Sequence, residues 1–123
     1  MVELVVKQSK IHGRGVFAEE SIKVRTIFYK VSLVNCIRYN KTGCAYVGDG
    51  KWLDDTKIIN FVNHSCDANA VLETSDNNAM LIASKNIEKG EEISLEYDRT
   101  ETNGMRQTCN CGSRNCKGYF LTL

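Results

Sequence analysis

Four of the six cysteines in this 123-residue chain have a spacing suited to metal binding. Cys109, Cys111 and Cys116 form a CxCx4C cluster among small and polar residues, which bury too little apolar surface to hold this segment in place. Four thiolates around one zinc ion would hold it, because structural zinc is usually tetrahedral with every position filled. Cys66 is the best candidate for the fourth ligand because it ends a second polar motif, Asn63-His64-Ser65-Cys66. The predicted zinc would tie the tail to that motif.

The Asn-His pair of the second motif could bind a polar ligand. An apolar stretch at residues 58–62 comes directly before Asn63 and His64, which indicates a buried approach to the motif. Buried Asn and His side chains need hydrogen-bond partners. Two interpretations stay open: the pair satisfies its own loop, or it lines a site for a polar ligand.

Two further motifs carry weaker signals. In Gly13-Arg14-Gly15 two glycines surround one residue, which allows either close approach of the backbone to a ligand or a plain turn. No strand-turn-helix unit follows, so this is not a dinucleotide-binding fingerprint. In the segment from Gly90 to Asp98, the pair Glu91-Glu92 is typical of a solvated turn. By pattern alone, Tyr97 is an ordinary tyrosine at the end of a strand.

Composition restricts the class of protein and its partners. The chain has 16 basic and 15 acidic residues and a net charge of +1, so neither nucleic acid nor an acidic membrane surface is expected as a partner. No apolar run approaches the roughly 18 residues of a membrane span. The N-terminus resembles no secretory leader, so we expect an intracellular protein: cytoplasmic, or nuclear and chromatin-associated if the source is eukaryotic or viral. A secreted disulfide framework is the competing interpretation of the even cysteine count.

The hydrophobic pattern predicts one domain built mainly from short strands. β-branched residues, period-two alternation and turn residues indicate strands at residues 4–6, 15–17, 26–37, 70–73, 80–83 and 93–97. Residues 74–78 are expected to form a hairpin loop. One short helix is expected at residues 56–62, with Asp54 or Asp55 as its N-cap.

The order of the motifs resembles the SET-domain family of protein lysine methyltransferases with a C-terminal post-SET zinc segment. Gly-Arg-Gly, Asn-His-Ser-Cys, Glu-Tyr-Asp and CxCx4C follow one another between about Lys7 and Gly118. The resemblance implies a mostly-β SET-domain (β-clip) fold of small curved sheets, with a C-terminal pseudoknot and a zinc-bound post-SET tail. It places the SET domain at residues 1–104 and the post-SET zinc segment at 105–123, as one compact unit.

The resemblance also implies roles for particular residues. Tyr97 matches the family's catalytic tyrosine, and one structural zinc ion would be held by Cys66, Cys109, Cys111 and Cys116. The residues implied to bind the co-substrate S-adenosylmethionine are His12, Gly13, Arg14, Gly15, Asn60, Asn63 and His64. Asn60 stands where many relatives carry Arg. A second tyrosine of the family is missing: Val31 falls nearest to its position, and Tyr29 could serve if the register shifts.

The function implied is an S-adenosylmethionine-dependent protein lysine N-methyltransferase. Its partner would be a protein or peptide that presents a lysine, with a histone tail as one candidate, and the protein would be a monomer or weak dimer. Leu95 stands where relatives often carry an aromatic residue that limits the number of methyl groups, so we hypothesise di- or trimethylation. The alternative, motivated by Asn60 and the missing tyrosine, is a catalytically weak or inactive SET-like, zinc-binding module for peptide interaction.

Overall fold

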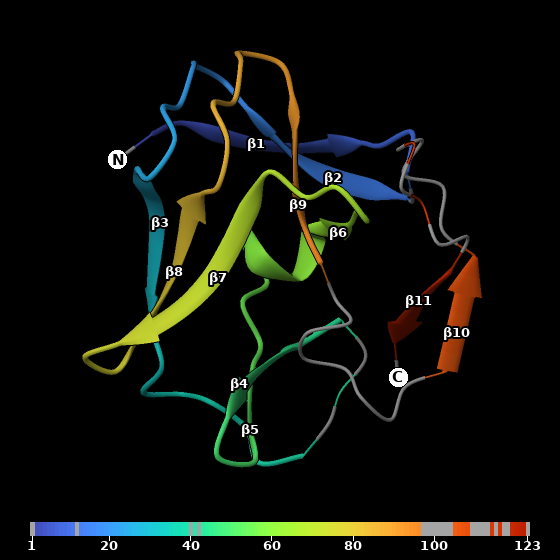
Figure 1. Cartoon of the computed structure of the whole chain (residues 1–123). Helices are drawn as coiled ribbons and strands as arrows, with labels where there is room; N and C mark the ends of the chain where they lie inside the picture. Colours follow the sequence, from blue (N-terminus) through green and yellow to red (C-terminus); the bar gives the residue numbers. More distant parts are fainter. Residues whose placement is uncertain are drawn as a thin grey trace.

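The computed structural model describes most of the chain. Described are residues 2–11, 13–39, 41, 43–96, 114 and 116, together with the backbone of the strands Met105–Thr108 and Tyr119–Thr122. Small sheets make up most of this structure, which confirms the mostly-β prediction (Figure 1). In the described part of the chain, no helix is long and apolar enough to cross a membrane.

The strands form two larger sheets and two separate hairpins. The four-stranded sheet has the spatial order β1 (Leu4–Gln8), β2 (Arg14–Ala18), β9 (Glu92–Leu95), β6 (Asn63–His64). The three-stranded sheet has the order β3 (Ile27–Ser32), β8 (Asn78–Ala83), β7 (Ala70–Ser75). The hairpins pair β4 (Ala45–Gly48) with β5 (Lys51–Leu53), and β10 (Met105–Thr108) with β11 (Tyr119–Thr122).

Strand β9 brings the motifs of the sequence together because it lies between β2 and β6. It pairs antiparallel with β2, where Val16 is opposite Ile93. It pairs parallel with β6, where Asn63 is opposite Ser94 and His64 is opposite Leu95. The Gly-Arg-Gly and Asn-His motifs therefore lie on the two sides of the strand that leads toward residue 97.

The hairpin predicted from the strands at residues 70–73 and 80–83 is present, but its loop is shorter than expected. Strands β7 and β8 continue to the pair Ser75 and Asn78, so only Asp76 and Asn77 form the turn instead of residues 74–78. Both turn residues have positive φ, 51° and 60°. Asp and Asn tolerate this left-handed conformation, and a two-residue turn of this kind matches the twist of the paired strands.

The long strand predicted at residues 26–37 is wrong in its second half. Strand β3 ends at Ser32, and a turn follows in which the Cys36 N–H donates to the Leu33 carbonyl at 3.1 Å. Ile37 then pairs in an isolated bridge with Trp52. The β-branched and aromatic residues of this region therefore serve two separate pairings, which local propensity alone does not distinguish.

The helix predicted at residues 56–62 is reduced to the 3-10 helix η1 (Ile59–Phe61). The N-cap position of η1 is Ile58 and not Asp54 or Asp55, but Asp55 Oδ2 accepts the Ile58 N–H at 3.3 Å and the Ile59 N–H at 2.9 Å. The chain becomes extended at Val62, with φ −76° and ψ 117°, and then enters β6. β-branched side chains weaken the helix, and pairing with β9 ends it.

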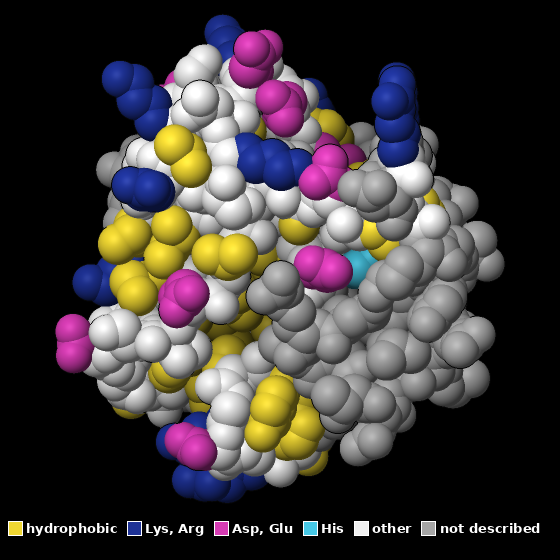
Figure 2. All heavy atoms as spheres, viewed as in Figure 1, with side chains coloured by type: hydrophobic (Ala, Val, Ile, Leu, Met, Phe, Trp, Pro, Cys, Tyr) yellow, Lys and Arg dark blue, Asp and Glu magenta, His cyan; other side chains and the backbone are white. Residues whose placement is uncertain are grey.

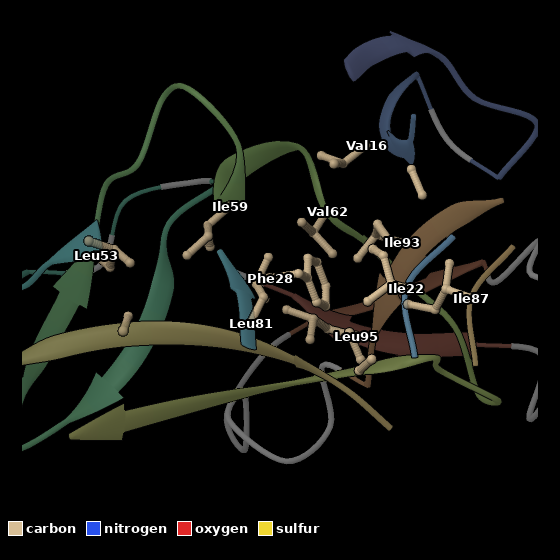
Figure 3. Close-up of a cluster of buried hydrophobic side chains, with 14 residues drawn as sticks. Val16, Ile22, Phe28, Leu53, Ile59, Val62, Leu81, Ile87, Ile93 and Leu95 are labelled. Carbon is tan, nitrogen blue, oxygen red and sulfur yellow. The ribbon is translucent and has the colours of Figure 1, made fainter. Parts of the chain in front are cut away.

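The hydrophobic core lies between the two larger sheets. Val16 and Ile93 from the four-stranded sheet and Phe28 and Leu81 from the three-stranded sheet are all fully buried (Figure 3). Side chains alternate along a strand, so the residues next to Val16 and Ile93 face the opposite side of their sheet. Gly15 and Glu92 are such neighbours, and the candidate site is built on that side.

The surface carries charges of both signs and some exposed apolar side chains. Figure 2 shows hydrophobic side chains gathered on the left, over the three-stranded sheet of Figure 1. Val24 and Ile27, before and at the start of β3, are 43% and 46% exposed. Among the described residues, basic and acidic side chains are interspersed on this face.

Candidate functional site

Asn63 lies at the centre of a polar cluster where β2, β6 and β9 meet. Its Nδ2 donates to Glu92 Oε2 at 2.8 Å and to the Arg14 carbonyl at 3.0 Å, and lies 3.2 Å from Ser9 Oγ. The residue is only 8% exposed. Acceptors on this side fix the orientation of the amide, because Nδ2 carries both of its hydrogens. Oδ1 must therefore face the other side of the amide group.

Glu92 is the acidic member of this cluster. Its carboxylate accepts the Ser9 hydroxyl, with distances of 2.7 and 2.9 Å to the two oxygens, and Ser9 Oγ in turn accepts the Ile11 N–H at 2.9 Å. The prediction of a solvated turn is therefore wrong for Glu92, although it describes Glu91, which is exposed and accepts the Glu88 N–H. Glu92 opens a strand whose next residue, Ile93, points into the core, so its own side chain points to the site.

Glycine is favoured at positions 13 and 15 for different physical reasons. A Cβ on Gly15 would lie 2.8 Å from Glu92 Cδ and 3.0 Å from Ser9 Cβ, so only glycine leaves room for the carboxylate. A Cβ on Gly13 would meet no atom within 4 Å, but its φ of +44° favours glycine. The Gly13 carbonyl closes a tight turn by accepting the Ser9 N–H at 2.8 Å. The turn occurs, and the close approach at Gly15 is to Glu92; approach of this backbone to a ligand stays a prediction.

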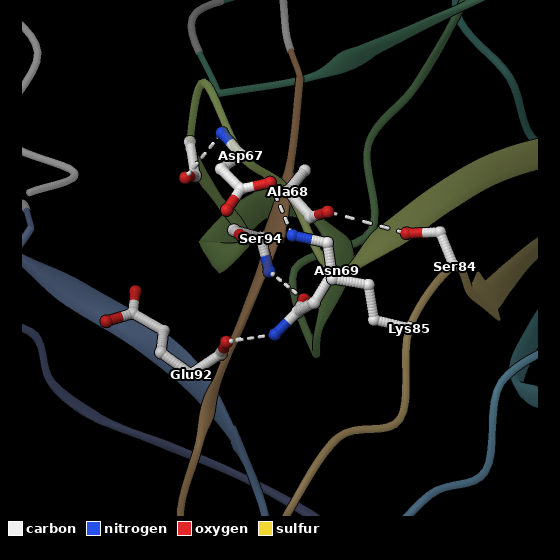
Figure 4. A network of polar contacts seen from close by, with 8 residues as sticks. Asp67, Ala68, Asn69, Ser84, Lys85, Glu92 and Ser94 are labelled. Carbon is white, nitrogen blue, oxygen red and sulfur yellow. Dashed lines mark hydrogen bonds and ion pairs between the residues drawn. The ribbon is translucent and has the colours of Figure 1, made fainter. Parts of the chain in front are cut away.

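Asn69 fixes the strand that carries Glu92 (Figure 4). Its Nδ2 donates to the Glu92 carbonyl at 2.8 Å, and its Oδ1 accepts the Ser94 N–H at 2.9 Å. The buried Asn69 side chain thus makes the hydrogen bonds that a neighbouring strand would otherwise make with these two backbone groups of β9. Its own carbonyl accepts the Ser84 N–H at 2.9 Å, which attaches the same segment to the end of β8. The sequence prediction did not include Asn69, since no local pattern marks an Asn that bonds to a distant strand.

His64 is buried next to the zinc-ligand candidate Cys66. Its side chain is 1% exposed, and its Nε2 lies 3.4 Å from Cys66 Sγ. The Ser65 N–H donates to the Leu95 carbonyl at 2.9 Å, so the motif follows β9 past the end of β6. Cys66 and Cys116 are both half-buried.

Four residues predicted for the site, His12, Tyr97, Cys109 and Cys111, lie outside the described residues. The described side chains of His, Cys, Asp and Glu form no group of three that could hold a metal ion. Cys109 and Cys111, two of the four predicted zinc ligands, are not among the described side chains, so the zinc site stays a prediction.

Asn60 is not part of the group around Asn63. Its Nδ2 donates to Asp54 Oδ1 at 2.6 Å, and its Oδ1 accepts the Asp55 N–H at 3.1 Å. Asp54 also forms an ion pair with Lys41 at 2.9 Å. These contacts use the Asn60 side chain to close the turn before η1, and its role toward a cofactor stays a prediction.

Two groups near this turn have raised pKa values. Tyr29 Oη donates to Asp55 Oδ2 at 2.7 Å, and burial, this hydrogen bond and the Asp55 charge together raise the pKa of the Tyr29 hydroxyl. Burial and a hydrogen bond with Asp54 raise the pKa of the Cys44 thiol to about 11. Both groups are neutral at physiological pH. Tyr29 therefore joins β3 to the η1 turn as a neutral hydrogen-bond donor.

The cluster around Asn63 is suited to binding a cation that donates hydrogen bonds. It combines a carboxylate, a hydroxyl, a backbone carbonyl and an amide oxygen, all of which are acceptors. Hydrogen bonds from an ammonium group to such acceptors are charge-assisted and stronger than neutral ones.

Comparisons with known proteins agree with this geometry. The family model described as the SET domain matches residues 13–98. Histone-lysine N-methyltransferase ASHR3 of Arabidopsis thaliana is 41% identical over 66 residues, covering 50% of this chain and 13% of the relative. Histone-lysine N-methyltransferase TRX1 of Oryza sativa subsp. japonica is 30% identical over 137 residues, covering 94% of this chain and 13% of the relative.

A solved structure extends the likeness to the fold. The complex of KRYPTONITE with mCHH DNA, an H3(1–15) peptide and SAH (S-adenosylhomocysteine) matches 97% of this chain and 29% of that chain, with a TM-score of 0.76 and 20% identity. The likeness therefore covers nearly all of this chain. The chain spans only 13% of the length of each of the two curated relatives.

Proposed function

This chain belongs to the SET-domain family, and we propose that it is an S-adenosylmethionine-dependent protein lysine N-methyltransferase. The observation that carries the proposal is the convergence of the Gly-Arg-Gly turn and the Asn-His motif on β9. Asn63 Nδ2 bonds to the Arg14 carbonyl within the segment that the family model matches. The homologues named histone-lysine N-methyltransferases support the same reaction at modest identity.

The described residues fit the amino-acid end of the cofactor. A methionine ammonium group needs acceptors in a partly buried place, and the cluster of Ser9, Arg14, Asn63 and Glu92 supplies them. S-adenosylmethionine supplies, when bound, a methyl group already activated by the sulfonium sulfur. The residues proposed to hold it are the backbone of His12, Gly13, Arg14 and Gly15 and the residues Asn60, Asn63 and His64.

The chain itself must position the two reactants and provide a neutral amine. Correct positioning is worth roughly 7–11 kcal/mol of the barrier in well-oriented reactions. A free lysine has a pKa near 10.4, so removing its proton at neutral pH costs about 4–5 kcal/mol. Leu95 at the end of β9 and Val62 before β6 are buried apolar side chains beside the motif. Apolar surroundings lower a lysine pKa because they disfavour the charged form. We propose Tyr97 as the catalytic residue at the end of the lysine channel.

We also propose one structural zinc ion, held by Cys66 from the SET domain and by Cys109, Cys111 and Cys116 from the post-SET segment, residues 105–123. Thiolates are the ligands that zinc prefers, and the described pair, Cys66 and Cys116, is half-buried. Zinc binding by short peptides contributes on the order of 10–16 kcal/mol, enough to order this tail. Elemental analysis should find one zinc per chain in the wild type and much less in Cys116→Ser. A wild type without zinc would contradict the site.

Methyl transfer tests the proposed reaction directly. The purified protein is incubated with labelled S-adenosylmethionine and, separately, histones, lysine peptides and a cell lysate, with Tyr97→Phe as the matched variant. We expect label on a lysine of a protein substrate, with histone H3 as the first candidate because a peptide of H3 is present in the KRYPTONITE complex. Transfer should fall by at least about a hundredfold in Tyr97→Phe.

The same assay separates the alternative function. A protein that binds S-adenosylhomocysteine but methylates no lysine would be the inactive, peptide-binding SET module. A protein that binds no cofactor and methylates nothing would refute the proposal.

A further inference from the structure

We propose that Glu92 is a positioning residue whose carboxylate holds the Asn63 amide in the orientation that presents Oδ1 to the ammonium group of the cofactor. This inference rests on the proposed function, because it concerns the same cofactor. Glu92 itself was not among the residues expected in the site. Its carboxylate oxygen lies 2.8 Å from Asn63 Nδ2, the shortest of the three contacts of that nitrogen with described residues.

The orientation of Asn63 matters because the two ends of an amide have the same shape but opposite hydrogen-bonding character. In the orientation found here, Nδ2 faces the carboxylate of Glu92 and the carbonyl of Arg14. A flipped amide would place Oδ1 against these two acceptors and would turn Nδ2 toward the ammonium group. Both changes are unfavourable, so the carboxylate selects the orientation that accepts a hydrogen bond from a cation. An ionised acceptor does this more strongly than a neutral one.

Glu92 is held in place from three directions. The Ser9 hydroxyl donates to its carboxylate at 2.7 Å. Gly15 leaves the space that the carboxylate fills, since a Cβ there would lie 2.8 Å from Glu92 Cδ. Asn69 holds the Glu92 carbonyl at 2.8 Å, so the backbone is fixed as well (Figure 4). A solvated surface acid needs none of these contacts, and together they indicate that the position of the carboxylate is important.

The experiment compares two ligands that differ at the end recognised by Asn63. S-adenosylhomocysteine has the amino-acid end, whereas methylthioadenosine is a similar nucleoside thioether without it. Their affinities are measured by isothermal titration calorimetry for the wild type, Glu92→Gln and the control Glu91→Gln. Glu91 is the adjacent acid, but it is exposed, and in the described structure its side chain bonds only to the Glu88 N–H.

We expect Glu92→Gln to weaken S-adenosylhomocysteine about tenfold, the size expected for a charge-assisted hydrogen bond. Methylthioadenosine should bind this variant as it binds the wild type, and Glu91→Gln should change neither affinity. Ser9→Ala, which removes one donor to the carboxylate, should show the same selectivity with a smaller effect of about threefold. In the protein without ligand, Glu92→Gln should shift the side-chain amide resonances of Asn63 in a 1H–15N spectrum.

The outcomes are distinguishable. If Glu92→Gln and Ser9→Ala weaken both ligands equally, or leave both unchanged, Glu92 does not position Asn63 toward the ammonium group. If the wild type binds neither ligand, the proposed function fails and this inference fails with it. If Glu92→Gln does not fold, as judged by its thermal unfolding, the affinities of Ser9→Ala for the two ligands decide.

Discussion

Replacing Gly15 by alanine should destabilise the protein through Glu92. A Cβ at this position would lie 2.8 Å from Glu92 Cδ and closer still to its Oε2, so the carboxylate must move. The carboxylate is the end of a flexible side chain and can swing away without straining the backbone. It would then lose its hydrogen bonds with Ser9 and Asn63. The expected loss of stability therefore comes mainly from these hydrogen bonds, with a smaller contribution from the 3.0 Å approach of the new Cβ to Ser9 Cβ.

The magnitude follows from two opposing effects. Hydrogen bonds to a charged group contribute about 1.5–3 kcal/mol, and Glu92 is half-exposed, which favours the lower end of that range. Alanine is more favourable than glycine in a strand by roughly 0.5–1 kcal/mol. Gly15→Ala should therefore lower the free energy of unfolding by about 1–2 kcal/mol, which is a fall in Tm of roughly 3–8 °C for a domain of this size. In a Glu92→Ala background only the gain from alanine remains, so the same change should be neutral or raise the free energy of unfolding by up to about 1 kcal/mol.

The assay is chemical denaturation of the wild type, Gly15→Ala, Glu92→Ala and the double variant. We expect a coupling free energy of about 2 kcal/mol between the two positions, well above the roughly 0.5 kcal/mol seen for independent sites. Gly13→Ala is the control: its φ of +44° makes alanine unfavourable, but its Cβ would touch nothing, so it should not couple to Glu92→Ala. Equal losses for Gly15→Ala in both backgrounds would refute the reasoning.

Four further predictions concern other residues. Tyr29→Phe should lower stability by about 1–2 kcal/mol through loss of the hydrogen bond to Asp55. The pKa of Tyr29 is raised in the folded state, so the unfolded state loses the hydroxyl proton at a lower pH. The free energy of unfolding of the wild type should therefore fall as pH rises above about 10. Urea denaturation at several pH values should show a smaller fall for Tyr29→Phe. With its pKa raised to about 11, Cys44 should react with iodoacetamide roughly a hundredfold more slowly than an ordinary cysteine at about pH 8; rapid labelling in a peptide map would contradict this. Asn69→Ala should cost about 2–4 kcal/mol in urea denaturation, because two backbone groups of β9 lose their partner, and a loss below about 0.5 kcal/mol would contradict the role given to Asn69. If the proposed reaction occurs, the wild type should form di- or trimethyllysine and Leu95→Phe mainly monomethyllysine, so a wild type that makes only monomethyl product in mass spectrometry would reject the hypothesis.

The sequence allowed the main strands and part of the site to be predicted. The strands around Val16 and Leu81 were expected from β-branched, alternating residues, and both are fully buried in the structure. The Gly-Arg-Gly and Asn-His motifs were expected to contribute to one site, and Asn63 Nδ2 does bond to the Arg14 carbonyl. The strand predictions succeeded because alternating β-branched residues form a local pattern, whereas the shared site was expected from the family resemblance and its role toward a cofactor stays a prediction.

Ser9, Glu92 and Asn69 could not be predicted in the same way. Ser9 and Glu92 are 83 residues apart in the chain, and their contact depends on the pairing of β2 with β9. Asn69 bonds to β9 only because the chain turns after β6, which propensity does not show. The sequence pattern indicated a solvated turn at Glu92. In the structure its strand, β9, lies between β2 and β6. Tertiary pairing, and not local propensity, decided the role of these three residues.

The helix before the Asn-His motif shows the same limit. Asp55 was one of two expected caps and does accept the Ile59 N–H. The helix nevertheless ends after Phe61, because Asn63 pairs with Ser94 of β9 immediately afterwards. Asp55 therefore lies near the start of the helix, but the helix begins at Ile59 and not at residue 56, and the tertiary pairing determines where it ends.

The most direct test of the central claim is a crystal structure of this protein with S-adenosylhomocysteine. We expect the amino-acid end of the ligand to lie at the junction of β2, β6 and β9, with its ammonium nitrogen within hydrogen-bonding distance of Asn63 Oδ1. A ligand bound elsewhere on the protein, or crystals grown at saturating ligand that contain none, would contradict the assignment of this junction as the cofactor site.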